Sequence, residues 1–206
     1  MSFPEHVYTQ GGDYLGSYRD ALIEAWQSVD VHAASRAAKL LETAVVGGRT
    51  VFSCGNGGSA AIANHLLCDF IKGVQTDTAL RPRVISLASH LELITAIAND
   101  IAYDEIFVYQ LRTMATADDV LLTISSSGDS ENIVRAIEWA HAHRVSSIAL
   151  TGFDGGRSAR LADVNLHVRA ENYGIVEDVH QSLMHSLAQY LRQHAMLAEL
   201  IPQRRF

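Results

Sequence analysis

Two pairs of polar side chains have the types and the spacing of a metal or acid–base site. His65 and Asp69 are four residues apart, and Glu177 and His185 are eight residues apart. If both segments are helical, each pair lies on one helix face, because four residues make about one turn and eight a little over two. Two imidazole nitrogens and two carboxylates can form a tetrahedral zinc site. Spacing alone leaves open that these residues lie on solvated helix faces.

A glycine-rich segment, Gly-Asn-Gly-Gly-Ser at 55–59, leads into a stretch predicted to be helical. Glycines let a ligand approach the backbone, and a helix N-terminus offers free N–H groups to an anion. The residues expected to line a bound ligand here are Asn56, Gly57, Gly58 and Ser59. A loose dinucleotide-binding pattern also fits, but its acidic residue, Asp77, falls in a loop before the second strand. No Gly-Lys-Ser/Thr follows, so the segment is not a P-loop.

A second segment, 125–130, reads Ser-Ser-Ser-Gly-Asp-Ser and precedes another predicted helix. Hydroxyl groups and backbone amides at a helix start suit a phosphate monoester, whose oxygens need several donors. The phosphate ligands expected from this segment are Ser125, Ser126, Ser127 and Ser130. The alternative is a capped loop in which Ser130 or Asp129 is the N-cap. Capping does not explain three consecutive serines.

The elements that must position these residues alternate between short β-rich runs and helical stretches. Apolar runs occur at 50–54, 84–87, 120–124, 147–151 and 164–168, and helical periodicity occurs at 14–28, 31–46 and about 175–200. The runs are apolar on both faces, as in strands covered by helices on both sides. The pattern predicts an α/β fold with a doubly wound, five-stranded parallel sheet flanked by helices, N-terminal helices and a long C-terminal helix.

Ligands of such sheets bind beyond the carboxyl ends of the strands, where the two segments above lie. Asn99 and Asp100 end a short helix after the second strand, and segment 151–156 follows the fourth. Each of these two is, taken alone, a normal turn. The chain is expected to be a single domain, 1–206, with N-terminal helices at 1–48 and the sheet, its helices and the C-terminal helix at 49–206.

Composition excludes several classes of protein. The formal net charge of −7 argues against direct nucleic-acid binding, which needs a basic surface. Hydrophobic residues make up 48% and charged residues 19%, enough for a core and unlike a disordered chain. Two cysteines, Cys54 and Cys68, are too few for a disulfide framework, which favours reduced thiols in the cytoplasm. No signal peptide and no membrane-spanning stretch is apparent.

Four motifs together resemble a known family. They are Ser-Cys-Gly-Asn-Gly-Gly-Ser at 53–59, Ala-Asn-Asp at 98–100, Asp-Val-Leu-Leu-x-Ile-Ser-x-Ser-Gly-x-Ser at 119–130 and Leu-Thr-Gly-x-Asp-Gly-Gly at 150–156. The combination resembles a sugar isomerase (SIS) domain of flavodoxin-like fold and, more narrowly, the bacterial phosphoheptose isomerases, over nearly the whole chain. The DnaA initiator-associating proteins share these motifs and are not known for isomerase chemistry. The resemblance therefore implies the fold more firmly than the activity.

The resemblance implies a zinc site and a proton-transfer pair. The family's zinc ligands, His, Glu, Gln and His, fall at His65, Asp69, Glu177 and His185. Asp69 thus replaces a glutamate and Glu177 a glutamine, and Ile62 stands where the family has an aspartate in the site. In the family, the glutamate of the first helix resembles the catalytic base of an enediol mechanism. The histidine of the last helix resembles the catalytic acid. With the shorter Asp69, the role of the base needs a backbone shift or passes to Glu177.

These observations predict a phosphosugar aldose–ketose isomerase that interconverts sedoheptulose 7-phosphate and a manno-heptose 7-phosphate. Asp69, Glu177 and His185 would be catalytic, Asn99 and Asp100 would join the glycine and serine segments in binding the sugar phosphate, and the metal would be Zn²⁺, with manganese or nickel as alternatives. Surplus apolar surface on the terminal helices and the resemblance both indicate a homotetramer. The alternative function is a non-catalytic sugar-phosphate-binding regulator or scaffold.

Overall fold

The computed structural model describes residues 2–206 and contains a parallel sheet with strand order β2-β1-β3-β4-β5. The strands are β1 (Thr50–Gly55), β2 (Arg83–Ser86), β3 (Val120–Ser125), β4 (Ser146–Thr151) and β5 (Val164–His167). Each predicted strand is present, displaced by at most one residue at either end. The predicted doubly wound α/β fold is confirmed.

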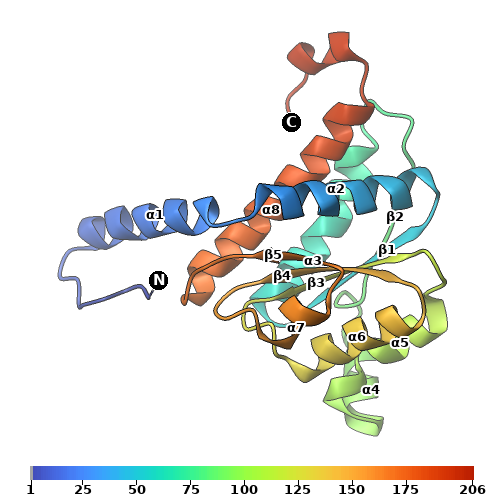
Figure 1. The fold of residues 1–206 in the computed structure, drawn as a ribbon, viewed down its shortest axis with the longest axis horizontal. Helices are drawn as coiled ribbons and strands as arrows, with labels where there is room; N and C mark the ends of the chain where they lie inside the picture. Colours follow the sequence, from blue (N-terminus) through green and yellow to red (C-terminus); the bar gives the residue numbers. More distant parts are fainter. Residues whose placement is uncertain (1) are drawn as a thin grey trace.

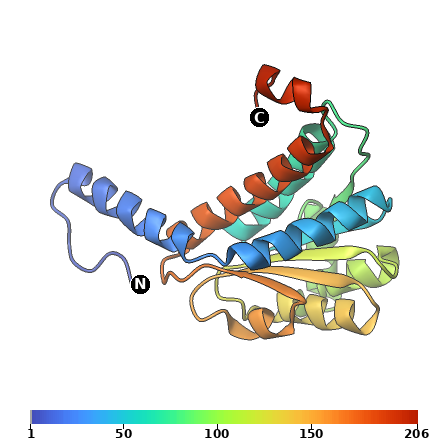
Figure 2. The ribbon, with the colours of Figure 1, turned by 45° about the horizontal axis from the view of Figure 1, so that its top comes forward.

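Both faces of the sheet are covered by helices (Figures 1 and 2). On one face lie α2 (Val31–Val46), α3 (Gly58–Cys68) and α8 (Tyr173–Ala195), and on the other α4 (Leu91–Asp100), α5 (Val108–Met114) and α6 (Glu131–Ala142). Successive strand residues point to opposite faces, so Leu122 packs with the first group of helices and Leu121 with the second. Most strand residues are buried because helices cover both faces of the sheet.

Helices α3 and α8 lie side by side and begin at the same edge of the sheet, beyond the carboxyl ends of the strands. The α-helical geometry of α3 ends at Cys68, and a single π-helical segment, η1 (Asp69–Val74), continues it. A π-turn is rare and is frequent at functional sites. The α3–η1 and α8 pair therefore provides two neighbouring faces on which side chains from distant parts of the chain can meet.

The last helix ends earlier than its periodicity predicts. It stops at Ala195 rather than near Leu200, because Met196 adopts an extended conformation, and a 3-10 segment, η3 (Ala198–Gln203), follows. The buried guanidinium of Arg192 holds this C-terminal part, donating to the backbone oxygens of Thr76 and Arg205. No helix within residues 2–206 combines the length and the hydropathy needed to cross a membrane.

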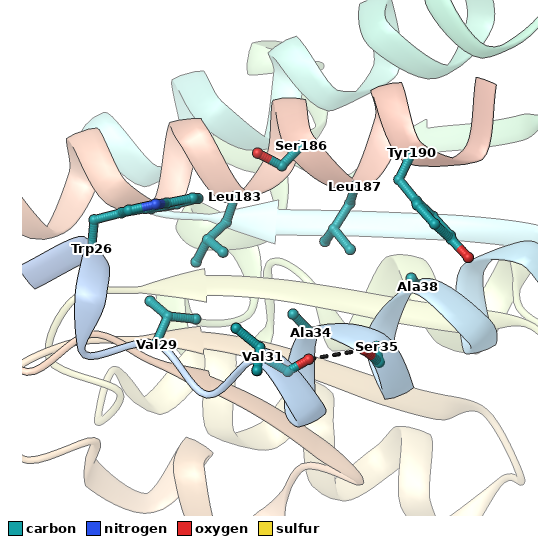
Figure 3. Close-up of a pocket in the computed structure, with 10 residues that line it drawn as sticks. All are labelled: Trp26, Val29, Val31, Ala34, Ser35, Ala38, Leu183, Ser186, Leu187 and Tyr190. Atoms are coloured by element: carbon teal, nitrogen blue, oxygen red, sulfur yellow. Dashed lines mark hydrogen bonds between the residues drawn. The ribbon is translucent and has the colours of Figure 1, made fainter. Parts of the chain in front are cut away.

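The first helix, α1 (Gly11–Gln27), extends away from the body of the molecule (Figures 1 and 2). Where α1 leads into α2, an apolar groove of about 340 Å³ lies against α8. Trp26 stands at one end of the groove and Tyr190 at the other, with Leu183 and Leu187 between them (Figure 3). The groove and the projecting helix leave apolar side chains exposed to solvent.

Candidate active site

The serine loop, residues 125–130, joins the end of β3 to the start of α6 and lies at the topological switch point of the sheet. The connection after β1 leads to β2 on one side, and the connection after β3 leads to β4 on the other. Adjacent crossovers that diverge in this way open a crevice beyond the strand ends, which is the usual ligand site of an open parallel sheet. The structure therefore places both predicted ligand-binding loops at one crevice.

Several polar groups of the serine loop are left for a ligand. The hydroxyl of Ser126 is buried, at 5% exposure for the residue, and has no hydrogen-bond partner among residues 2–206. Ser130 occupies the N-cap position of α6, but its side chain makes no capping hydrogen bond. A buried, unpaired hydroxyl is costly unless something binds it. Ser125 and Ser127 instead accept hydrogen bonds from backbone N–H groups of the loop itself.

An ion-pair network fixes the far end of the serine loop. Arg157, on α7 (Gly156–Leu161), donates to the Asp129 carboxylate at 2.6 Å and to the Glu131 carboxylate at 2.9 Å. The hydrogen bond from Arg157 lowers the pKa of Asp129, so this carboxylate is held ionised. The network joins the loop after β3 to the helix after β4, and it stiffens the crevice without occupying it.

The glycine loop, residues 55–59, is joined to the start of α6 by two side-chain amides that hydrogen-bond to each other. The side-chain amides of Asn56 and Asn132 each donate to the other's oxygen at 3.0 Å, and the hydroxyl of Tyr103 donates to the Asn56 oxygen at 3.0 Å. Asn132 is buried at 1% exposure. The Asn56 side chain, predicted to line the sugar, is therefore engaged in joining the two loops. Gly57 has a φ of 56°, a conformation that favours glycine at this turn.

Glu177 projects from the first turns of α8 into a cavity of about 140 Å³ beside the serine loop. The cavity is lined by Asn56, Ser59, Ile124, Ser125, Ser126, Ser127, Ser130, Tyr173 and Glu177. The carboxylate lies so close to Gly58 that a Cβ at this position would collide with it. Burial, reinforced by the charge of Asp178, raises the pKa of the Glu177 carboxyl. A carboxylate with a raised pKa in a polar cavity is a candidate general base.

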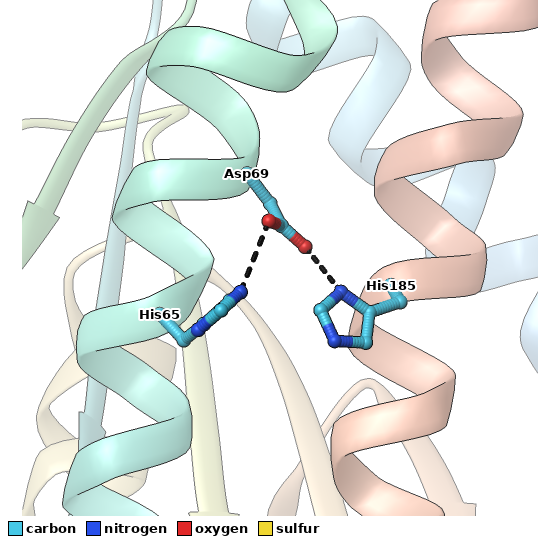
Figure 4. A group of neighbouring side chains, drawn as sticks. All are labelled: His65, Asp69 and His185. Atoms are coloured by element: carbon cyan, nitrogen blue, oxygen red, sulfur yellow. Dashed lines mark hydrogen bonds and ion pairs between the residues drawn. The ribbon is translucent and has the colours of Figure 1, made fainter. Parts of the chain in front are cut away.

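A second cluster forms further along the same two helices (Figure 4). Asp69 lies between two imidazoles, with Oδ1 at 3.2 Å from Nε2 of His65 and Oδ2 at 2.6 Å from Nδ1 of His185. One ligand atom from each of the three residues lies within 4.8 Å of the others. Two imidazole nitrogens and a carboxylate oxygen suit zinc, and three protein ligands are the usual number for a catalytic zinc site. The three side chains thus fit a divalent metal.

Glu177, predicted as the fourth ligand, lies outside this three-residue group. Its carboxylate points toward Gly58 and the serine loop instead. The shorter acid, Asp69, reaches both histidines where the helix changes from α to π geometry, so the backbone departs from a regular α-helix at this residue. The structure therefore divides the predicted four-residue set in two. His65, Asp69 and His185 form one cluster, and the Glu177 carboxylate lies apart in the cavity beside the serine loop, which we call the serine cavity.

Asn99 and Asp100 are not brought into the serine cavity. Both are exposed at the end of α4, and the amide of Asn99 donates to the Asp100 carboxylate at 2.7 Å. Within this chain they form the end of a helix, in agreement with the alternative that they make a normal turn.

Sequence reasoning missed several residues that shape the site. Tyr173 lines the cavity, Asn132 and Tyr103 hold the glycine loop, and Arg157 holds the serine loop. The sequence contained only a weak signal for Asn132, which is a polar residue two positions after the N-cap residue Ser130. Gln181, which contacts His185, carried a clearer one, because residues four apart on a helix share a face.

His180, on α8, is completely buried at 0% exposure. Neither ring nitrogen has a hydrogen-bond partner among residues 2–206. Burial lowers the pKa of His180 to about 4. The imidazole is therefore neutral at physiological pH, and it belongs to the support of the site rather than to its proton transfer.

Comparison with known proteins agrees with this geometry. Residues 14–152 match the SIS domain family, a class of sugar-isomerase folds. The chain is 40% identical to the phosphoheptose isomerase of Colwellia psychrerythraea, covering 75% of this chain and 80% of that protein. It is 36% identical to the Shewanella frigidimarina phosphoheptose isomerase over 84% of this chain and 92% of that protein.

Two solved structures are also similar. The phosphoheptose isomerase of Francisella tularensis superposes with a TM-score of 0.80 at 33% identity, covering 88% of this chain and 96% of that one. The Neisseria gonorrhoeae phosphoheptose isomerase gives a TM-score of 0.79 at 31% identity, over 87% and 96%. The chain is thus a SIS-domain protein. It belongs to the phosphoheptose isomerase family and is a sugar-phosphate isomerase.

Proposed function

We propose that the chain interconverts sedoheptulose 7-phosphate and a manno-heptose 7-phosphate through an enediol. One observation supports this proposal above the others. Glu177, a carboxylate of raised pKa, lines the same cavity as the four serines of the serine loop. The cavity joins an anion-binding end to a proton-accepting group, which is what isomerisation of a phosphorylated sugar requires. The rest of the seven-carbon substrate extends along the adjoining surfaces of α3 and α8.

The phosphate is held by the serine loop. Ser126 and Ser130 contribute hydroxyls that are free of protein partners or caps, and the first turn of α6 contributes N–H groups. The Glu177 carboxylate lies at the N-terminus of α3, which makes that helix end unsuitable for a second anion. The serine loop is therefore the anchor, and the glycine loop contacts the uncharged part of the sugar.

Glu177 acts as the base. It takes a proton from the carbon next to the carbonyl group, the carbonyl oxygen gains a proton, and the enediol forms. Return of the carbon-bound proton to the former carbonyl carbon, with loss of the proton of the other enediol hydroxyl to solvent, completes the isomerisation. Asp69 is less suited to this role because its carboxylate already contacts His65 and His185. His185 is less suited to the acid role for the same reason, because both of its ring nitrogens already have partners.

His65, Asp69 and His185 would hold a divalent metal, with zinc favoured by the two imidazoles and manganese or nickel as alternatives. When bound, such an ion would polarise the oxygens of the sugar near its carbonyl group. The three side chains also orient one another, because each histidine contacts a different oxygen of Asp69.

The test is turnover of sedoheptulose 7-phosphate by the purified protein and by Glu177→Gln. We expect a loss of kcat of about 100-fold or more in Glu177→Gln, with KM changed little, because general-base catalysis contributes factors of this size. Glu171→Gln is the matched control, since Glu171 is exposed and outside the cavity. Full activity of Glu177→Gln would refute the assignment of the base. A wild-type protein that binds the phosphosugar without turnover would support the non-catalytic alternative.

We also propose a homotetramer and a cytoplasmic location. The exposed apolar residues of α1, including Leu15, Ile23 and Trp26, and the groove of Figure 3 support association with other copies. The free thiols of Cys54 and Cys68 support a reducing compartment. Light scattering at micromolar concentration tests the first proposal, and a monomeric mass would contradict it.

A further inference from the structure

Both ring nitrogens of His185 have a partner, and one of the partners is Gln181. The side-chain amide nitrogen of Gln181 lies 2.8 Å from Nε2 of His185, one turn earlier on α8. On the other edge of the ring, Nδ1 lies 2.6 Å from Oδ2 of Asp69. The imidazole thus contacts one residue of its own helix and one of the neighbouring helix, although its side chain is 40% exposed.

The chemistry of the two partners fixes the proton on the neutral ring. An ionised carboxylate only accepts hydrogen bonds, so Nδ1 must carry the proton that is donated to Asp69. The neutral ring then has a lone pair on Nε2, and this lone pair accepts an N–H from the Gln181 amide. The two contacts therefore correspond to the Nδ1–H tautomer of a neutral His185 ring, with the amide nitrogen of Gln181 turned toward the ring.

An amide suits a second state of the same ring. If Nδ1 binds a cation in place of its proton, Nε2 carries the hydrogen, and the ring needs an acceptor on that edge. Rotation of the Gln181 amide by half a turn presents its oxygen there. A glutamate could serve only the second state and a leucine neither, because an amide alone contains both a donor and an acceptor.

We propose that Gln181 is a positioning residue that keeps Nδ1 of His185 turned toward Asp69, both in the metal-free protein and with a divalent ion bound. Gln181 acts through His185 and does not contact the substrate. The metal-bound part of this inference rests on the proposed function, which places an ion at His65, Asp69 and His185. The metal-free part rests only on the hydrogen bonds above.

The first arm of the test is nitrogen NMR of the histidine rings in the metal-free protein. We expect His185 to be protonated on Nδ1 and bare on Nε2, and we expect the Nε2 resonance to move in Gln181→Leu. Gln193→Leu is the matched control, since Gln193 lies on the same helix two turns after His185. A wild-type ring protonated on Nε2, or an Nε2 resonance unchanged in Gln181→Leu, would overturn the proposal.

The second arm is zinc affinity, measured by competition with a chromophoric chelator. Loss of the partner of a metal-binding histidine typically weakens binding 10- to 100-fold, so we expect a loss of about this size in Gln181→Leu. Gln181→Glu, which can accept from Nε2–H, should bind zinc at least as well as the wild type. Gln193→Leu should match the wild type. Equal affinity of Gln181→Leu and the wild type would overturn the metal-bound part of the proposal.

The two arms separate this proposal from the proposed function. If the wild-type protein binds no zinc, the metal site of the proposed function fails, and the nitrogen spectra of the metal-free protein still decide the position of the His185 ring. If zinc binds but Gln181→Leu and Gln193→Leu behave alike in both arms, the metal site stands and Gln181 has no positioning role.

Discussion

His180→Leu should make the protein less sensitive to acid. The His180 ring is completely buried in α8, and neither nitrogen has a hydrogen-bond partner among residues 2–206. Burial lowers its pKa from the ordinary 6.5 to about 4, an effect that the backbone of Thr151 reduces and the nearby His167 increases. A group whose folded pKa is depressed takes up a proton more readily when the chain is unfolded. The free energy of unfolding therefore decreases as the pH falls below 6.5.

The size of the effect follows from the two pKa values. The stability lost between pH 6.5 and the folded pKa of about 4 approaches about 3 kcal/mol, because a tenfold change in proton affinity corresponds to about 1.36 kcal/mol. At pH 5 the loss is about 2 kcal/mol, and at pH 7 it is close to zero. Leucine cannot take up a proton, so the variant should keep this amount. The replacement also removes two unpartnered nitrogens from the interior.

The assay is urea unfolding of the wild type and His180→Leu at pH 7 and pH 5, at one protein concentration. The change in unfolding free energy between the two pH values should be about 2 kcal/mol larger for the wild type. The other histidines are present in both proteins, so their contributions cancel in this double difference. His141→Leu, at an exposed position of α6, is the control and should follow the wild type. If wild type and His180→Leu lose the same free energy, the buried neutral imidazole is refuted.

Three further outcomes are expected. Gly58→Ala should displace the Glu177 carboxylate and lower kcat by about 100-fold, as misplaced catalytic groups do, while phosphosugar binding measured by calorimetry is kept. Asn132→Leu should leave the amide of Asn56 without its partner and lower the free energy of unfolding in urea by about 1–3 kcal/mol. Arg192→Met should release the C-terminal segment, which limited chymotrypsin digestion would detect as faster cleavage; an unchanged rate would contradict its role as a clamp.

The sheet and its flanking helices could be predicted from the sequence because their signals are local. Each strand is a short apolar run bounded by turn residues, and both faces of the sheet are covered, so no alternation had to be resolved. The two ligand-binding loops followed from the rule that parallel strands present their carboxyl ends to ligands. The end of α8 was less predictable, because periodicity continues past Ala195 while the backbone does not.

The candidate site could be predicted only in part, because its details depend on side-chain direction and on contacts through space. The spacing of Glu177 and His185 places both on one face of α8, but it does not say that one turns toward Gly58 and the other toward Asp69. The pairing of Asn56 with Asn132 joins residues 76 positions apart, and no local pattern reports such a contact.

The π-turn at Asp69–Val74 has a consequence for changes in chain length. Its hydrogen bonds close over five residues rather than four, so the turn holds one residue more than an α-turn. Removing a single residue there would restore a regular helix and leave the sheet untouched. Because a five-residue turn completes about the same rotation as four residues of an α-helix, the residues on either side of the gap would keep their faces. Asp69 could then still face His185 while the fully buried position of Phe70 stays in the core. A one-residue gap in this segment of a related chain would therefore leave the ligand set in place and mark only a narrower turn, although elsewhere such a gap marks a shorter loop.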